Sequence, residues 1–174
     1  MKTKTCKTRV RVFLWAALAA SVGLLPVAGQ AGGRVLNIQT PTFPPDASVT
    51  GAVKRECQLP QKLSKFVKQY ADGFDAINTG VEPSAEGWNL SIQIVQATAG
   101  GGWGGAKTLN IKGKLYDGKK LIGSFRGQRT TTGGAWGGYK GTCSKLGRDA
   151  KALGRDIAQW LQEPTMNAGI GELR

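Results

Sequence analysis

The sequence contains no histidine, and this absence excludes several classes of catalytic and metal site at once. Serine–histidine–acid triads, cysteine–histidine pairs and most zinc or transition-metal sites need an imidazole group. We therefore expect no metal, no cofactor and no enzymatic activity.

Acidic residues are also few, with 11 Asp and Glu against 24 Lys and Arg, and they are scattered. Asp149 and Asp156 lie in one predicted helix, where a charged helix face explains them better than paired acid–base chemistry. An enzyme of lysine or aspartate chemistry stays a third hypothesis. It would need a concave site with a shifted pKa near Lys140, Asp117 or Asp149.

Long apolar runs are missing except near the N-terminus, where residues 12–28 follow a basic segment without acidic residues. A basic head, an apolar middle and a small-residue exit are typical of a secretory signal peptide, here with cleavage after Gly29 or Ala31. An uncleaved anchor is the alternative, but the run is short for a spanning helix and contains Gly23 and Pro26. We expect removal of this segment and no stable membrane insertion afterwards.

Cysteine is scarce, with three residues in the chain. Cys6 precedes the apolar run and no cysteine lies at its exit, so the lipobox of a lipoprotein is absent and a periplasmic or secreted protein is expected. In an oxidising compartment Cys57 and Cys143 are expected to form one disulfide. The long loop that it closes would stabilise the fold by roughly 4–5 kcal/mol in the chain-entropy model. Two buried free thiols are the alternative.

The chain remains basic after the signal peptide is removed, because 19 basic residues then face 11 acidic ones. The excess is concentrated between Gly101 and Arg155, where 12 Lys and Arg accompany only Asp117 and Asp149. Such a face suits a polyanion or an anionic surface, and a merely solvated surface is the alternative.

The remaining length suffices for one domain with one core. We expect a signal peptide at 1–29, a flexible leader at 30–45 with a possible short strand at 34–39, a single domain at 46–163 and a C-terminal tail at 164–174.

Two segments have apolar residues at helical spacing. Residues 59–70 have Pro60 in the first turn and Gly73 as a stop, and residues 142–161 begin at Thr142 as a cap and end before Pro164. Four basic residues are expected on the polar side of the second helix: Lys145, Arg148, Lys151 and Arg155.

Alternating apolar residues predict strands at 47–53, 89–94 and 109–116, and a further strand from Lys120 onward, whereas 74–88 is expected to be a loop. The fold class that follows is α+β, a two-layer sandwich with a mainly antiparallel sheet of four or five strands and two helices on one face.

Asp117 and Gly118 indicate a hairpin turn. A two-residue loop would place the apolar residues of the second strand on the wrong face. We therefore expect three or five loop residues and the pairing of Leu115 with Leu121, which sets Gly113 opposite Gly123.

Two glycine-rich stretches each contain one tryptophan, Trp103 in residues 100–105 and Trp136 in residues 133–138. They are expected at one end of the sheet. Each ring either packs over its own loop or, beside Tyr139, forms an exposed platform for a sugar, peptide or protein.

The glycines of the first stretch match the dinucleotide fingerprint as a string, but a strand follows where that motif needs a helix. The segment 137–142, with Lys140, resembles a loose phosphate cradle at the start of a helix, which predicts a weak anion site. Trp88 and Trp160 are expected in the core.

The hairpin carries the best polyanion patch, with Tyr116 as its accompanying aromatic residue. Six basic residues are expected on its outer face and tip: Lys112, Lys114, Lys119, Lys120, Arg126 and Arg129.

The segment from Asn89 to Leu161 resembles a loose group of bacterial envelope proteins of unknown function. The resemblance lies in the order of a strand, the stretch Ala99–Gly105, the strand Leu109–Gly118, the partner strand Lys120–Phe125, a second glycine stretch and a terminal helix. It implies the α/β sandwich of the penicillin-binding-protein activator lipoproteins and of the curli secretion lipoprotein. The missing lipobox departs from these anchored relatives, and the resemblance supplies no catalytic residue.

We therefore expect an exported, non-enzymatic envelope protein that binds an envelope protein or an anionic polymer rather than nucleic acid. The alternative is direct binding of a polyanion or glycan through the hairpin and the two tryptophans, which would weaken steeply with salt.

Overall fold

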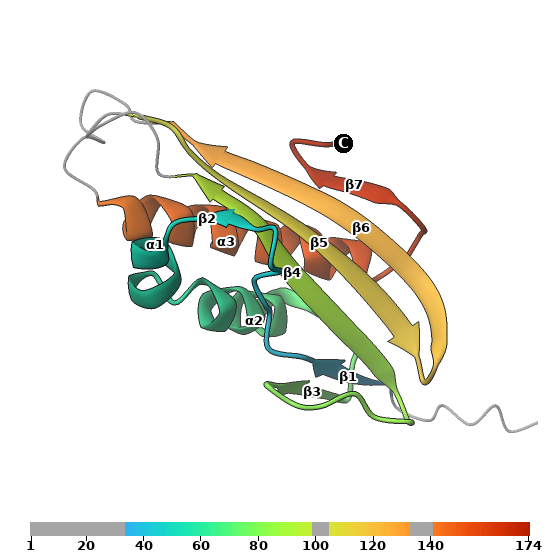
Figure 1. Ribbon diagram of the computed structural model, residues 1–174. Coiled ribbons are helices and arrows are strands. Elements are labelled where there is room, and N and C mark those ends of the chain that lie inside the picture. The colour runs from blue at the N-terminus through green and yellow to red at the C-terminus, as the bar shows by residue number, and fades with distance from the viewer. Residues whose placement is uncertain (1–33, 99–104, 133–140) are drawn as a thin grey trace, which may run out of the picture. The chain divides into compact units, whose positions relative to one another are not determined.

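The computed structural model describes residues 34–98, 105–132 and 141–174. They form an α+β sandwich, in which helices cover one face of a single sheet (Figure 1). The predicted fold class is confirmed, although the described ranges contain seven strands and three helices. The predicted signal peptide lies outside the described residues.

Three long antiparallel strands form the centre of the sheet: β4 (Trp88–Thr98), β5 (Lys107–Asp117) and β6 (Lys120–Thr131). Side chains alternate between two faces along each strand. Leu90, Leu115 and Phe125 lie on the inner face, which packs against the helices and is buried. The opposite face is here called the outer face. The predicted strands are confirmed in this region.

Four short strands extend this centre, all in parallel pairings: β1 (Val35–Ile38), β2 (Ser48–Val49), β3 (Ala76–Thr79) and β7 (Ala168–Gly171). The expected short strand at 34–39 is confirmed as β1, but the segments expected as a leader and as a tail belong to the sheet. The expected loop at 74–88 contains β3. Strands of four residues or fewer are too short to show a clear alternation, and the sequence pattern therefore missed β3 and β7.

Residues 51–56 form the helix α1 (Gly51–Glu56), where a strand was predicted. The amide of Val53 donates a hydrogen bond to Oγ1 of Thr50 over 3.4 Å, and Thr50 thereby caps the helix. Val53 is the buried residue of this helix. Alternation over so few positions does not distinguish a strand from one helical turn and a half.

The two predicted helices are confirmed as α2 (Leu59–Tyr70) and α3 (Thr142–Trp160). Gly141 occupies the N-cap position of α3, so the expectation that Thr142 is the cap is wrong by one residue. Lys145 was expected on the polar side of α3, but it is only 1% exposed, because the buried side of this helix is wider than the apolar spacing indicated. In the described ranges no helix is both long and apolar enough to cross a bilayer.

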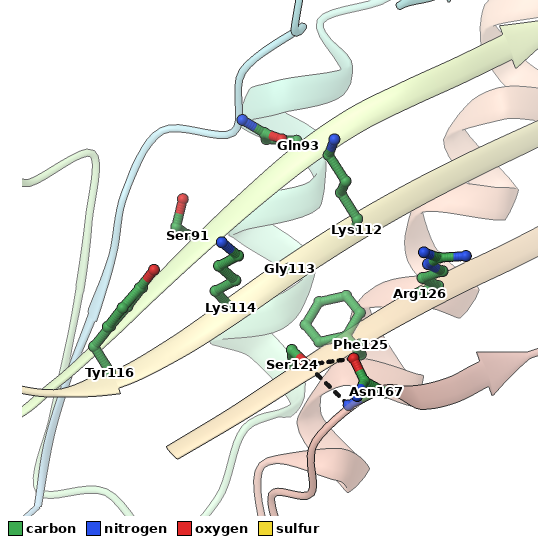
Figure 2. A pocket seen from close by; sticks show the side chains of 10 residues that line it. All are labelled: Ser91, Gln93, Lys112, Gly113, Lys114, Tyr116, Ser124, Phe125, Arg126 and Asn167. Atoms are coloured by element: carbon green, nitrogen blue, oxygen red, sulfur yellow. Dashed lines mark hydrogen bonds between the residues drawn. The ribbon is translucent and has the colours of Figure 1, made fainter. Parts of the chain in front are cut away.

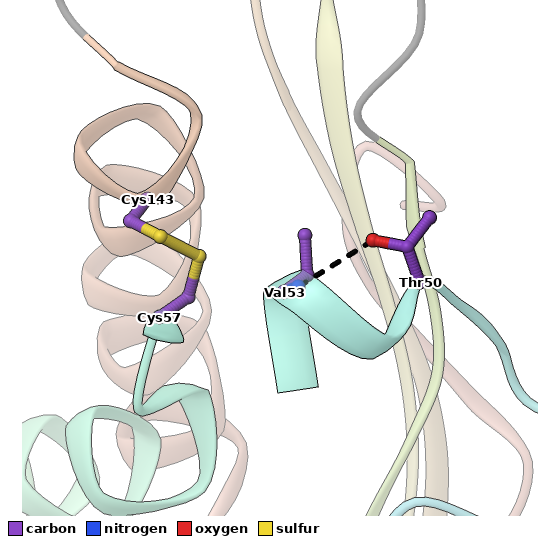
Figure 3. The surroundings of a disulfide bond; sticks show 4 residues. All are labelled: Thr50, Val53, Cys57 and Cys143. Atoms are coloured by element: carbon purple, nitrogen blue, oxygen red, sulfur yellow. Dashed lines mark hydrogen bonds between the residues drawn. A yellow bond between two sulfur atoms is a disulfide. The ribbon is translucent and has the colours of Figure 1, made fainter. Parts of the chain in front are cut away.

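Cys57 and Cys143 form the predicted disulfide, with 4.8 Å between their Cα atoms (Figure 3). Cys57 follows α1 and precedes α2, and Cys143 lies in the first turn of α3. The bond therefore links the starts of the two long helices. Farther along, Gly154 lets these helices approach closely, because a Cβ atom there would lie 2.5 Å from Cβ of Phe66.

The hairpin between β5 and β6 has a two-residue loop, because Asp117 pairs with Lys120. Gly118 has a φ of 54°, which suits the first position of such a tight turn. The predicted register is wrong by two residues, since Leu115 pairs with Gly123. A bulge at Ile122 inserts one extra residue into β6 and places Gly123 and Phe125 on the expected inner face. Leu121 precedes the bulge and is exposed opposite Tyr116, so its expected place on the inner face is wrong.

Candidate functional site

The outer face of β4, β5 and β6 is polar and carries three of the six basic residues that the hairpin pattern predicted. Lys112 and Lys114 alternate with the buried residues of β5, and Arg126 alternates with those of β6. Strand geometry therefore points all three side chains away from the helices. The structure brings these three predicted residues together on one face.

A depression of about 740 Å³ lies on this outer face, and Figure 2 shows the side chains around it. None of its lining residues is acidic. They are Ser91, Gln93, Lys112, Gly113, Lys114, Tyr116, Ser124, Phe125, Arg126 and Asn167. We call this depression with its lining the outer-face site.

Two cations of the outer-face site lie directly opposite each other. Lys112 pairs with Arg126 across β5 and β6, and with Gln93 on the other side. Among the described residues, neither Lys112 nor Arg126 forms an ion pair. Like charges directly opposite each other in a sheet destabilise it, so this arrangement opposes folding slightly. A bound anion would remove that repulsion.

Uncharged hydrogen-bonding groups flank the third cation. Lys114 pairs with Ser91 of β4 and with Ser124 of β6. The backbone N–H of Asn167 donates a hydrogen bond to Oγ of Ser124 over 2.8 Å, which ties the segment before β7 to the rim of the site (Figure 2). The site thus combines positive charge with hydroxyl and amide groups.

The floor of the outer-face site is backbone at Gly113. Residue 113 has to be glycine, because the ring of Phe125 fills the space on the inner face that a Cβ atom would need. Phe125 in turn packs against Trp160 of α3, with 4.9 Å between ring centroids. The core therefore supports the floor of the site.

A second depression, of about 340 Å³, adjoins the first because Lys112 and Arg126 line both. Its lining includes Asn110 and Gln128, and the half-exposed Leu173 lies at its edge. The two depressions together follow β5 from Tyr116 to Asn110, which is about 20 Å at roughly 3.4 Å per residue. The surface suits an extended ligand.

The expectation that Arg129 lies on the outer face is wrong. Arg129 is on the inner face, where Nε and Nη2 each donate a hydrogen bond over 2.8 Å to the carboxylate of Asp156 in α3. These bonds raise the pKa of the Arg129 guanidinium. Lys119 and Lys120 are exposed at the hairpin tip, as predicted, but they do not line the outer-face site.

Asp149 and Asp156 were expected on a charged helix face, but both are buried against the sheet. Oγ1 of Thr131 donates a hydrogen bond to Oδ1 of Asp149, whereas Oδ2 has no hydrogen-bond partner among the described residues. Burial raises the pKa of Asp149 to about 6. A carboxylate held in this way is poised to take up a proton near neutral pH.

The enzyme hypothesis required a concave site beside a group with a shifted pKa. Asp149 lines neither depression of the outer face, nor a third one of about 670 Å³ that is lined by Asp117 with Arg34 and Trp88. Within the described ranges, no group of three or more His, Cys, Asp or Glu side chains could hold a metal ion. Among the described residues, Asp149 therefore lines none of these three depressions.

Trp88, expected in the core, is only half-buried. It packs edge-on against Phe74 at a centroid distance of 5.7 Å, and the Arg34 guanidinium lies 5.2 Å above its ring. Trp160 is 5% exposed, so its predicted core position is confirmed.

Four predicted site residues lie outside the described residues: Trp103, Trp136, Tyr139 and Lys140. The flanks of their two glycine-rich stretches are described. Thr98 pairs with Thr108, and Lys107 pairs with Thr131. The described strands β4 and β6 therefore end at the same end of the sheet. Both alternatives for the two indole rings, packing over their own loops and forming an exposed platform, stay predictions.

Several residues of the outer-face site were not identified from the sequence. Ser91 and Gln93 lie on β4 beside Lys114 and Lys112, and strand alternation together with the pairing of β4 with β5 would have found them. Asn167 had no sequence signal, because only the parallel pairing of β7 with β6 brings it to the rim.

No family model and no curated protein sequence matches this chain. Among solved structures, an uncharacterised protein matches 74% of this chain and 92% of its own, with a TM-score of 0.54 and 13% identity. A hypothetical protein from Chlamydia trachomatis matches 75% of this chain and 96% of its own, with a TM-score of 0.52 and 8% identity. A protein from Xanthomonas campestris, described by the family model DUF330, matches 74% of this chain and 83% of its own, with a TM-score of 0.50 and 10% identity.

At these identities the likeness shows a shared fold alone. The α+β sandwich is thus a fold that bacterial proteins of uncharacterised function also have. The finer resemblance to the penicillin-binding-protein activator lipoproteins and the curli secretion lipoprotein is not shown by these structures and stays a prediction.

Proposed function

We propose that this protein is an exported, non-enzymatic binding protein of the cell envelope, and that the outer-face site binds an anionic polymer there. The observation that carries the proposal is the opposed pair Lys112 and Arg126, which together with Lys114 surrounds one depression whose lining contains no acidic residue. None of the three cations forms an ion pair with a residue that the structure describes. An acidic protein surface is the alternative partner.

The energetic argument rests on charge repulsion in the unbound protein. Like charges directly opposite each other on neighbouring strands destabilise a sheet, at exposed positions by on the order of a few tenths of a kcal/mol. A pair of like charges that destabilises the fold is expected where the two charges together bind an anionic ligand. An anion between Lys112 and Arg126 converts that repulsion into two attractive interactions, which also steers anionic ligands to this face.

Export is part of the proposal. It is supported by the basic head and apolar run at the N-terminus and by the disulfide between Cys57 and Cys143, a bond typical of oxidising compartments.

The test uses the protein purified from an exporting bacterial host. Polygalacturonate, polyphosphate and polyglutamate are titrated at low and high salt by calorimetry against wild type and against the variant K112Q/K114Q/R126Q. A matched control, K65Q/K68Q/K151Q, removes the same charge from exposed positions of α2 and α3.

We expect at least one polyanion to bind wild type in a strongly salt-dependent manner. The outer-face variant should lose at least about tenfold in affinity, which is 1.4 kcal/mol, and the control at most about threefold. The proposal fails if no polyanion binds, or if the two triple variants lose affinity equally. Binding of an acidic protein instead of any polymer would support the alternative partner.

A further inference from the structure

We infer that the ligand of the outer-face site is an acidic polysaccharide, a chain of sugar rings that carry carboxylate groups at intervals. This inference rests on the proposed function and adds the chemical class of the polymer. Three properties of the site carry it: the spacing of its charges, the uncharged groups between them, and the ring of Tyr116.

The charges of the site are sparse for its length. Three cations line the first depression, and the second adds none beyond the shared Lys112 and Arg126. A phosphate unit is much shorter than a pyranose ring, so the charges of a polyphosphate lie closer together along the chain than those of a polymer of sugar acids. A polyphosphate is therefore best neutralised by a dense cationic surface. Along the roughly 20 Å that the two depressions span, three cations match a polymer whose acidic groups are separated by neutral parts.

Neutral donors and acceptors fill the spaces between the cations. Ser91 and Ser124 lie on either side of Lys114, and Gln93 lies beside Lys112. Hydroxyl and amide side chains both donate and accept hydrogen bonds, which is what sugar hydroxyl groups require. A polypeptide with acidic side chains offers fewer hydroxyl groups for these positions.

The ring of Tyr116 supplies an apolar surface at one end of the site. Tyr116 is half-buried and lies on the same face as Lys114, two residues along β5 (Figure 2). Within the described part of the chain, its ring stacks on no other aromatic ring and on no cation. A tyrosine has an apolar body and a polar tip, which suits the C–H face and the hydroxyl edge of a pyranose ring.

These features assign positions along the ligand. A carboxylate lies between Lys112 and Arg126, a second acidic group lies at Lys114, and a sugar ring rests on Tyr116. The chain then continues past Arg126 toward Gln128 and Leu173 in the second depression.

The experiment compares polygalacturonate with polyphosphate and polyglutamate of similar length and at equal salt, using wild type and the variants Y116L and Y116F. Y116L keeps an apolar side chain without an aromatic face, and Y116F keeps the ring. Circular dichroism and the Tm of each variant confirm that it is folded.

We expect wild type to prefer polygalacturonate. Y116L should lose at least about fivefold in affinity for polygalacturonate and less than about twofold for the other two polymers, whereas Y116F should keep most of the affinity. The inference is overturned if polyphosphate or polyglutamate binds as tightly as polygalacturonate, or if Y116L affects all three polymers equally. Either result would leave the proposed anion-binding function standing. That function fails only if none of the polymers binds in a way that depends on the three cations.

Discussion

Arg126 and Arg129 lie three residues apart on β6, and the strand places them on opposite faces of the sheet. Arg129 is held by two hydrogen bonds to Asp156, whereas Arg126 is exposed and faces Lys112. The inner face therefore uses its charge to join the sheet to α3. The outer-face cations Lys112, Lys114 and Arg126 form no ion pair within the described ranges, at a small cost in stability, which is the pattern expected of a binding surface.

The interface between α3 and the inner face also contains a charge that opposes folding. Asp149 is 3% exposed, its Oδ2 atom has no described hydrogen-bond partner, and its pKa is raised to about 6. Neutralising single residues on the two faces should therefore change the free energy of unfolding in three different ways.

The largest effect is expected for Arg129→Met. It leaves the buried Asp156 carboxylate without its partner, and breaking a buried pair costs roughly 3–5 kcal/mol. Because the Arg129 side chain is 35% exposed, we expect a loss near the lower end, about 3 kcal/mol. Urea unfolding at pH 7 measures it.

Two further variants sharpen this result. Arg126→Met makes the same chemical change on the outer face and should change stability by less than about 0.5 kcal/mol. Adding Asp156→Leu to Arg129→Met should recover most of the loss, because no uncompensated charge then remains. Equal losses for the two arginine variants would contradict the distinction between the faces.

The second effect is a gain for Asp149→Asn that depends on pH. The pKa of Asp149 is about 6 in the folded protein against an ordinary value of 3.8, so the folded state binds more protons than the unfolded state between these values. The contribution of Asp149 to stability therefore falls as the pH rises from about 4 to 6 and stays low above that. We expect Asp149→Asn to stabilise the protein by about 2 kcal/mol at pH 7 and by little at pH 4.

Denaturant unfolding of wild type and Asp149→Asn between pH 4 and 8 measures this difference. Asp72→Asn, at an exposed position, is the control and should show no comparable trend. A difference between Asp149→Asn and wild type that is independent of pH would show that Asp149 does not carry the buried charge.

The smallest effect is expected for Lys112→Gln on the outer face. Removing one of two directly opposed like charges should stabilise the sheet by about 0.3 kcal/mol, and the gain should shrink at high salt. Thermal unfolding at low and high salt measures the shift in Tm. A clear loss of stability would mean that Lys112 has a structural role and is not kept for a ligand.

Periodicity in the sequence was sufficient for the long elements. The helical spacing of Leu63 and Val67 and the alternation around Ile111 each extend over enough residues to identify α2 and β5. The same method failed for α1 and β3, where only a few residues are involved. Short elements form because neighbouring chain segments supply hydrogen bonds and burial, and their own sequence carries little of that information.

Part of the site could be read from alternation alone, and part was read incorrectly. Lys112, Lys114 and Arg126 were placed on the outer face as the structure has them. Arg129 was grouped with them, although three residues along a strand lead to the opposite face. Asn167 could not have been found, because its position depends on a pairing between segments that are 43 residues apart.

The sequence by itself determined that this chain contains no histidine, that it is basic, and that its fold includes two amphipathic helices and a hairpin flanked by glycine-rich stretches. These conclusions need only residue identity and local spacing. The tertiary structure alone decided which charges are paired: the bulge at Ile122 sets the register that places Lys112 opposite Arg126, and the packing of α3 brings Asp156 to Arg129. Distances across a sheet and between layers set the strength of charge interactions, and a one-dimensional pattern does not contain them.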